Sequence, residues 1–218
     1  GQVTGNYDDT ASHIYIDDAT VMRTVFGGGK LGILGTYEDG QFKGKDTFVF
    51  ISGFIISNVF GGGEGHINSA ISGAVGSTLV VIDGNAQVGV TEEQSVEGPS
   101  GLTITGGNVY GGGRLSVTGS FKIDVNKPGV IIPSSEAGIH KDNSAETRVV
   151  ILGGTIYNSV YGGGFSPKAT IAGSTHVNIG DHAAKIVNGT NRGDYCSQSA
   201  YDFLKSHNVT LASNDVII

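Results

Sequence analysis

Short stretches in which apolar and polar residues alternate recur along the chain. In each stretch a polar residue, often Ser or Thr, precedes apolar residues at every second position, which is the pattern of a β-strand with one buried face. Eight stretches have this pattern: Ser12–Ile16, Thr47–Ile51, Thr78–Ile82, Leu102–Ile104, Phe121–Val125, Arg148–Ile151, His176–Ile179 and Asn208–Leu211. We therefore predict eight short strands, one per structural repeat, with connections of irregular length between them.

A phrase of six residues occurs four times and is the clearest internal repeat. Each copy is a small polar residue, Val, an aromatic residue and three glycines: Thr24–Gly29, Asn58–Gly63, Asn108–Gly113 and Ser159–Gly164. The first glycines of successive copies lie 34, 50 and 51 residues apart, and each longer gap is about twice the size of a typical coil. We expect a degenerate copy in each long gap, at Val88-Gly89 and Pro128-Gly129, and a fifth copy at Ile186–Gly189.

The strands and the repeated phrase together predict an all-β fold. A strand that recurs once per coil can pair with the same strand in the coils above and below, which gives parallel ladders around a continuous interior. We predict a single-domain parallel β-helix over residues 1–218, a solenoid of about seven coils. With about 4.8 Å between neighbouring strands the rod would be roughly 35 Å long. The irregular coil lengths favour the right-handed type.

Insertions and a cap complete this prediction. Three segments rich in charge, Gly or Ser are expected to form long loops: Thr36–Asp46, Thr91–Ser100 and Ser134–Ala145. A capping box at Ser199–Asp202 precedes Phe203 and Leu204, which predicts a short capping helix within residues 197–206. Such a helix would cover an open end of the solenoid, where unpaired strand edges are otherwise exposed.

Composition and charge support the all-β class and narrow the partners. The chain has 37 glycines, 4 prolines and only 38% apolar residues, which is typical of many short strands and turns. A net charge of -7 with no basic stripe argues against nucleic acid as a partner. The most apolar stretch, Phe48–Phe60, contains Ser, Gly and Asn and is too short to span a bilayer, so no membrane insertion is expected. The single cysteine, Cys196, leaves the redox compartment open.

The phrase Val-Tyr-Gly-Gly-Gly that follows the strand-like segment Val149–Ile156 resembles repeats in large secreted surface proteins of anaerobic gut bacteria. More broadly, residues 12–190 resemble right-handed parallel β-helix adhesins and autotransporter passengers. The resemblance implies an exported protein, secreted or at the cell surface, with an adhesive or structural role. It supplies no catalytic residue. The first residue is Gly and no signal peptide is visible, which is typical of a processed or recombinant fragment.

The repeated phrase also supplies the candidate binding residues. Adjacent residues of a strand point to opposite faces, so either the valines or the aromatic residues Phe26, Phe60, Tyr110 and Tyr161 face the interior. We favour the aromatic residues inside, because Phe has no polar group for a wet surface. The alternative is an outward aromatic series on which sugar rings or a partner protein could stack.

The glycines and the small polar residues of the phrase have structural explanations. Three successive glycines allow positive φ and close backbone approach, which a corner requires, and the alternative is an exposed strip open to another surface. Asn58 and Asn108 are expected to be turn residues that hydrogen-bond the backbone.

We find no pattern typical of catalysis or metal binding. The acidic doublets Asp8-Asp9 and Asp17-Asp18 lack the partner cluster that polysaccharide cleavage needs. The residues that follow the four triplets, Lys30, Glu64, Arg114 and Phe165, share no ligand chemistry, which argues against a calcium-binding roll, and the histidines show no zinc spacing. No metal and no cofactor is therefore expected. Arg192-Gly193-Asp194 matches the integrin-binding tripeptide and is a further binding candidate.

Three functional hypotheses follow. The first is an extracellular, non-catalytic adhesin-like protein whose solenoid surface binds carbohydrate or protein. The second is a structural subunit of a fibre or surface layer that associates with itself end to end. The third is a polysaccharide-active β-helix enzyme, against which the missing carboxylate cluster argues.

Overall fold

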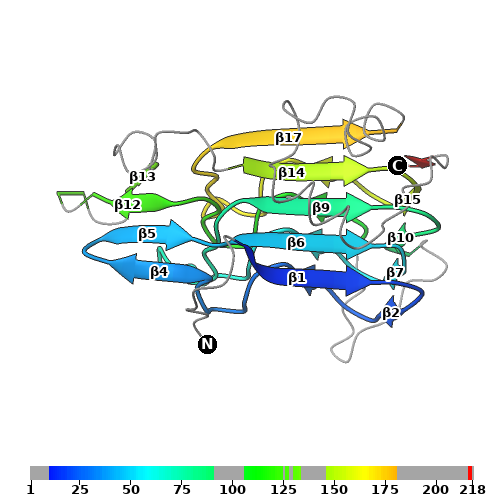
Figure 1. Ribbon diagram of the computed structural model, residues 1–218, viewed down its shortest axis with the longest axis horizontal. Helices are drawn as coiled ribbons and strands as arrows, with labels where there is room; N and C mark the ends of the chain where they lie inside the picture. Colours follow the sequence, from blue (N-terminus) through cyan, green and yellow to red (C-terminus); the bar gives the residue numbers. More distant parts are fainter. Residues whose placement is uncertain are drawn as a thin grey trace.

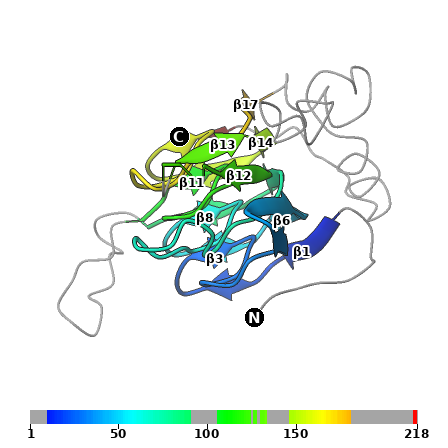
Figure 2. The ribbon, with the colours of Figure 1, turned by 90° about the vertical axis from the view of Figure 1, so that its left-hand side faces the viewer.

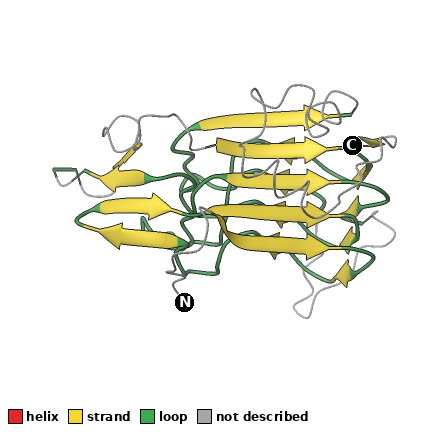
Figure 3. Cartoon of the chain, viewed as in Figure 1, coloured by secondary structure: helices red, strands yellow, loops and turns green. Residues whose placement is uncertain are grey.

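The computed structural model describes residues 10–90, 106–124, 126–127, 130–133, 146–180 and 216–217. All regular structure in these ranges is β-strand, arranged in four sheets (Figure 3). The predicted all-β class is confirmed. The predicted strands at Leu102–Ile104 and Asn208–Leu211, the loops after residue 90 and residue 133, and the capping helix at residues 197–206 lie outside the described residues.

The first sheet contains the long strands and is entirely parallel (Figure 1). Its strands are, in order, β1 (Thr10–Ile16), β6 (Asp46–Ile51), β9 (Thr78–Ile82), β14 (Glu146–Ile151) and β17 (Ser174–Ile179). They are rich in the β-branched residues Val, Ile and Thr, which favour a pleated and half-buried surface. These five strands contain five of the eight that the alternating pattern predicts, and they pair in register.

The second sheet is built from short strands that follow the long ones along the chain. Its order is β18 (Val216–Ile217), β15 (Gly154–Ile156), β10 (Gln87–Val88), β7 (Phe54–Ile55) and β2 (Thr20–Val21), all parallel. Each of these strands has only two or three residues. The sequence pattern gave no signal for them, because two residues are too few for an alternation to be visible.

The third sheet consists of the Val-aromatic pairs of the repeated phrase. Its parallel strands are β16 (Val160–Tyr161), β11 (Val109–Tyr110), β8 (Val59–Phe60) and β3 (Val25–Phe26). Valine pairs with valine and aromatic with aromatic along the whole sheet. The four copies therefore occupy the same place on successive levels. Figure 2 shows β3, β8 and β11 one above another, on the opposite side of the molecule from β1 and β6.

One strand from each parallel sheet makes a level of the molecule. The first level is β1, β2 and β3, the second β6, β7 and β8, the third β9, β10 and β11, and the fourth β14, β15 and β16; β17 and β18 lie above them. This arrangement is compatible with a β-solenoid. The predicted number of about seven coils is wrong for the described residues, which occupy five levels.

The direct pairing of copies explains this error. Val59 pairs with Val109, and Val109 with Val160, so each long gap contains a single circuit and no degenerate copy is inserted in the third sheet. Val88 lies in the second sheet, where it pairs with Ile55 and Ile156. Gap length was misleading because insertions, rather than extra circuits, lengthen the chain between copies.

Part of the inserted chain forms a side sheet, which is antiparallel. Its order is β13 (Ile131–Pro133), β12 (Phe121–Ile123), β5 (Gln41–Gly44) and β4 (Gly35–Glu38). Two predictions are corrected here. The expected loop Thr36–Asp46 contains most of the β4–β5 hairpin, and the expected solenoid strand at Phe121–Val125 pairs in this side sheet. Both inserted segments carry apolar residues of their own, so they fold together.

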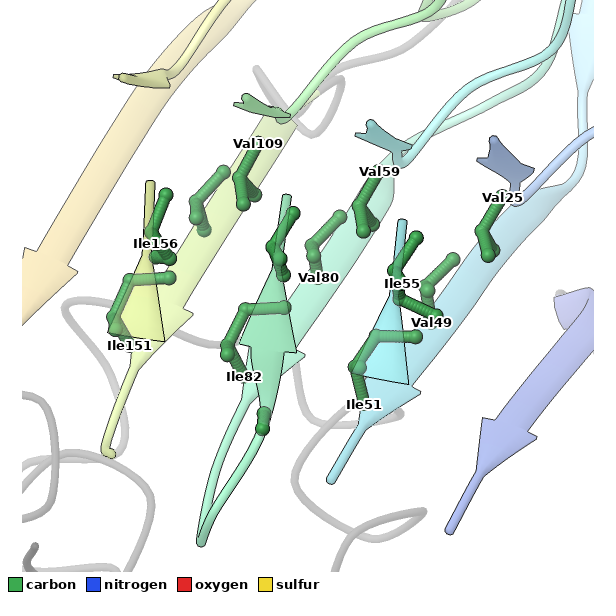
Figure 4. Close-up of a cluster of buried hydrophobic side chains, with 13 residues drawn as sticks. Val25, Val49, Ile51, Ile55, Val59, Val80, Ile82, Val109, Ile151 and Ile156 are labelled. Atoms are coloured by element: carbon green, nitrogen blue, oxygen red, sulfur yellow. The ribbon is translucent and has the colours of Figure 1, made fainter. Parts of the chain in front are cut away.

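Two apolar clusters hold these sheets. The larger one lies between the three parallel sheets and stacks equivalent aliphatic residues from level to level, as the close-up in Figure 4 shows. Val49, Val80 and Val149 form one such stack, each at most 1% exposed. A smaller cluster around Phe42 and Phe121 joins the side sheet to the main body. Each fully buried aliphatic side chain contributes about 1.5–3 kcal/mol. No helix that could cross a membrane is present in the described part of the chain.

Candidate functional site

The aromatic residues of the third sheet form a continuous stack, which we call the aromatic column: Phe26, Phe60, Tyr110 and Tyr161. Successive ring centroids lie 4.9, 4.6 and 4.9 Å apart, and the ring planes are within 10° of parallel. The valines beside them point into the central cluster. The preference for buried aromatic residues is correct for Phe60 and Tyr110, but these rings lie on the face of the third sheet opposite the central cluster, which the valines fill.

The inner rings of the aromatic column are nevertheless buried. Phe60 is 3% exposed and Tyr110 7%, whereas Tyr161 at the end is 46% exposed. Rings this close occupy each other's faces, so a sugar ring has no room to stack along the middle of the column. Burial, and after it the neighbouring Tyr161, raises the pKa of the Tyr110 phenol above its usual value.

The triglycine segments are packed against each other rather than exposed as a strip. A β-carbon on Gly61 would lie 2.2 Å from the carbonyl oxygen of Gly111, and one on Gly62 would lie 2.7 Å from the amide nitrogen of Gly113. Gly61–Gly63 and Gly111–Gly113 are buried. The expectation of positive φ is wrong for all four triplets. These glycines are required because neighbouring backbones approach closely.

A column of hydroxyl groups from the first sheet fixes the triplets in place. On each of the four lower levels a side-chain hydroxyl donates to the carbonyl oxygen of the first glycine of the same level. The donors are Ser12, Thr47, Thr78 and Thr147, and the acceptors are Gly27, Gly61, Gly111 and Gly162 respectively. The Ser or Thr at the start of these four first-sheet strands is thus a structural partner of the repeated phrase, and Thr47, Thr78 and Thr147 are buried.

The residue after each triplet forms a second outward column, which we call the charged column: Lys30, Glu64 and Arg114. Their backbones pair as parallel bridges, and Phe165 follows at the end. Glu64 lies 3.5 Å from the Lys30 amine and 3.5 Å from the Arg114 guanidinium. The side chains of Lys30 and Arg114 are 76% and 47% exposed, and that of Glu64 only 20%. The residues after the triplets differ in type, which argued against a shared calcium ligand. In the structure Lys30, Glu64 and Arg114 alternate in charge, and this alternation was the sequence signal for the charged column.

The two columns meet at the last copy of the phrase. Phe165, which is 50% exposed, lies edge-on to the buried ring of Tyr110 at 5.8 Å, and Tyr161 stacks on the same ring. Tyr161 and Phe165 therefore form an exposed aromatic pair. We call the aromatic column, the charged column and this pair together the ladder face.

Asparagines border the ladder face. The side-chain oxygen of Asn58 accepts hydrogen bonds from the backbone amide and from the side-chain amide of Asn108, each at 3.0 Å. The expected role of these residues as backbone partners is confirmed for Asn58. The bonds run between two levels rather than within one turn.

The remaining candidates contribute no cluster. Asp17 accepts a hydrogen bond from the Ser52 hydroxyl at 2.6 Å, which is a contact between neighbouring levels at the end of the first sheet. Burial, and then Asp17 and two further aspartates, raise the pKa of Tyr15 there. In the described part of the chain no group of three His, Cys, Asp or Glu side chains is placed to hold a metal ion. Arg192-Gly193-Asp194 lies outside the described residues.

No protein-family model, curated protein or solved structure matches this chain. The assignment of a role therefore depends on the geometry of the molecule and on the resemblance of its repeats.

Proposed function

We propose that the chain is one right-handed β-solenoid that acts at the cell surface or outside the cell, as a non-catalytic adhesin-like module whose ladder face binds a protein or a glycan. The extracellular location rests on the resemblance of the repeats to secreted surface proteins. The right-handed winding is supported by the path of the chain in Figure 1. The first-sheet strands run left to right at the front, and the chain returns behind them to begin the next level above.

The observation that carries the proposal is that equivalent positions of the repeat form columns over successive levels. The ladder face presents a column of stacked aromatic rings beside a column in which the charge alternates. Repeat proteins use such extended surfaces to bind other macromolecules. An exposed pair such as Tyr161 and Phe165, with Arg114 beneath Phe165, has the residue types that are enriched at protein interfaces.

The packing of the rings favours a protein over a glycan as the partner. Sugar recognition by stacking needs a free aromatic face, and the faces of Phe60 and Tyr110 are covered by their neighbours. A glycan would be restricted to the exposed end at Tyr161. A protein surface can instead contact the exposed rings of Tyr161 and Phe165 together with the exposed charges of Lys30 and Arg114.

Binding assays with charge-reversed variants test this function. The probes are immobilised mucin, plant cell-wall polysaccharide, fibronectin, collagen and laminin, and the variant is Lys30→Glu combined with Arg114→Glu. We expect saturable binding to at least one probe and a loss of about tenfold or more in the variant. Because exposed ion pairs contribute only about 0–1 kcal/mol to folding, the variant should remain folded.

The matched control is the same charge reversal at the side sheet, Lys43→Glu, where Lys43 is exposed and lies outside the ladder face. This variant should bind like the original protein. Equal losses in the control and the test variant, or no binding to any probe, would refute the proposal. Release of new reducing ends or unsaturated sugars from the polysaccharide would instead support the enzyme hypothesis.

A second candidate function is a structural subunit that associates end to end. Val177 and Ile179 continue the interior stacks of the first sheet, yet each is 41% exposed. This exposed apolar surface favours the second candidate. Electron microscopy of the purified protein distinguishes the two, since a structural subunit would form filaments and a binding module would remain as separate particles.

A further inference from the structure

The residue that follows the charged column has an unusual backbone conformation on two levels. Leu31 follows Lys30 with a φ of 64°, and Leu115 follows Arg114 with a φ of 56°. A positive φ is strained for a bulky residue, whereas a short polar residue such as Asp39 in the β4–β5 turn tolerates it. Glycine would remove the strain, and the chain contains 37 glycines. The presence of Leu at both positions therefore needs an explanation.

The backbone of these two leucines has a structural role, but their side chains belong to neither apolar cluster. The amide of Leu31 donates to the carbonyl oxygen of Glu64 at 2.7 Å, and that of Leu115 donates to that of Phe165 at 3.2 Å. These bonds join each level to the next. The side chain of Leu31 is 50% exposed and that of Leu115 is partly exposed, and neither packs in the central cluster or in the one around Phe42. Strained residues of this kind gather at binding sites.

The levels also differ in length at the corner where these leucines lie. Two backbone bridges bound this corner, and the second level needs residues 64–75 to pass between them, whereas the third level needs only residues 114–118. The longer path contains Ile67, which is 56% exposed. In repeat proteins such insertions lie on one face, which is often the binding face. The insertion and the strained leucines thus indicate the same part of the surface.

The charges at this corner favour an acidic partner. One carboxylate oxygen of Glu64 faces the Lys30 amine and the other faces the Arg114 guanidinium, so the three side chains together carry one excess positive charge. Both cations are much more exposed than the carboxylate. The whole chain has a net charge of -7, but salt screens charges beyond about 8 Å. A partner in contact with this corner therefore meets the local positive charge.

We infer that Leu31, Leu115, Lys30 and Arg114, which we call the leucine corner, bind an acidic segment of another protein. The carboxylates of this segment pair with the two cations, and its apolar side chains pack on the two leucines. An anionic glycan could use the cations, but a leucine offers it no flat ring for stacking. The inference rests on the proposed function of the ladder face and names the chemistry of the partner.

Selection from a peptide library tests this chemistry. The probe is a display library of short random peptides, selected on the immobilised protein, and the readout is the composition of the enriched peptides. We expect enrichment of Asp and Glu together with apolar residues. Selection on the variant Leu31→Asn with Leu115→Asn should not enrich these peptides. Asn tolerates a positive φ, so this variant removes the apolar contact and keeps the backbone.

Affinity measurements locate the binding of an enriched peptide. By fluorescence anisotropy, Leu31→Asn with Leu115→Asn should bind it about tenfold or more weakly, and so should Lys30→Glu with Arg114→Glu. The affinity of the original protein should fall as salt is raised. The matched control is Met22→Asn. Met22 is an apolar residue, 60% exposed, that precedes the third sheet instead of following it, and this variant should keep the affinity.

Thermal denaturation separates a binding role of the leucines from a structural role. Leu31→Gly removes the strain, so this variant should unfold at the temperature of the original protein or above it, while its affinity for the peptide falls. A fall in the melting temperature of more than about 4 °C would show that Leu31 serves the fold, and would overturn the inference.

The other outcomes are equally decisive. A library that enriches no peptide, enriched peptides without acidic residues, or equal affinity for the double leucine variant and the original protein would each overturn the inference. So would binding of heparin that needs Lys30 and Arg114 but neither leucine, because the corner would then bind a glycan. The proposed function is judged separately. It stands if fibronectin or another earlier probe binds the original protein and not the charge-reversed variant, whatever the library selects.

Discussion

The hydroxyl of Thr78 donates a hydrogen bond of 2.5 Å to the carbonyl oxygen of Gly111, 33 residues further along the chain. The bond joins the start of a first-sheet strand to the triglycine segment of the same level. Thr78 is 3% exposed, so water cannot take the place of its hydroxyl in this hydrogen bond. The same relationship recurs at Thr47 and Thr147. It connects the two sequence signals, the alternating stretches and the repeated phrase, into one structural unit.

Replacement of this hydroxyl should destabilise the fold. In Thr78→Val the carbonyl of Gly111 is left buried without the bond, which we expect to lower the free energy of unfolding by about 1–3 kcal/mol. Thr78→Ser keeps the hydroxyl and should lose less. Thr175→Val at the exposed end should change the stability of the free protein by no more than about 0.5 kcal/mol. Urea denaturation of the three variants measures the difference, and equal losses for Thr78→Val and Thr78→Ser would contradict the assignment.

The middle glycines of two triplets provide a matched test of close packing. A methyl group at Gly62 would lie 2.7 Å from the amide nitrogen of Gly113, so Gly62→Ala should cost about 1–3 kcal/mol or prevent folding. Gly163 has free space and lacks positive φ. Gly163→Ala should therefore be neutral or stabilise by up to about 1 kcal/mol. Thermal denaturation of both variants checks this, and similar melting temperatures would show that the triplets are not in contact.

Tyr110 should make the stability of the protein sensitive to alkaline pH. Its pKa in the folded protein is raised by burial and by Tyr161. Since the unfolded chain then loses the phenol proton first, the stabilisation is complete below the ordinary tyrosine pKa of about 10 and is lost as pH rises through the folded pKa. Denaturation midpoints measured at increasing alkaline pH should fall less steeply in Tyr110→Phe. Tyr157→Phe is the control, and its midpoints should fall with pH as steeply as those of the original protein. If the midpoints of Tyr110→Phe fall equally steeply, Tyr110 is not the cause of the pH dependence.

The third-sheet pairing could be predicted from the sequence because each copy of the phrase is short and strict. A Val-aromatic pair before three glycines can align with its equivalents in only one way, so Val25, Val59, Val109 and Val160 fall in register. The number of levels could not be predicted from the same copies. An insertion and an extra circuit lengthen the chain equally, and only the direct pairing of Val59 with Val109 distinguishes them.

The candidate site was predicted in part. Phe26, Phe60, Tyr110 and Tyr161 do lie together, as the repeat required, but on the outward face. Which of the two neighbouring residues joins the central cluster depends on how the three parallel sheets pack together, which no single strand encodes. The pairing of Lys30, Glu64 and Arg114 was missed because their types differ, and a column of alternating charge is recognised only once the repeats are aligned.

The sequence by itself determined the all-β class, the positions of the five long parallel strands and the alignment of the repeated phrase, since these depend on local alternation and on residues a few positions apart. Only the tertiary structure decided which circuits are adjacent, which side chains face the interior and which inserted segments pair in the side sheet. These properties depend on contacts between residues tens of positions apart, such as Thr78 with Gly111 and Lys30 with Glu64. Insertions of variable length separate such pairs, so their spacing along the chain does not reveal them.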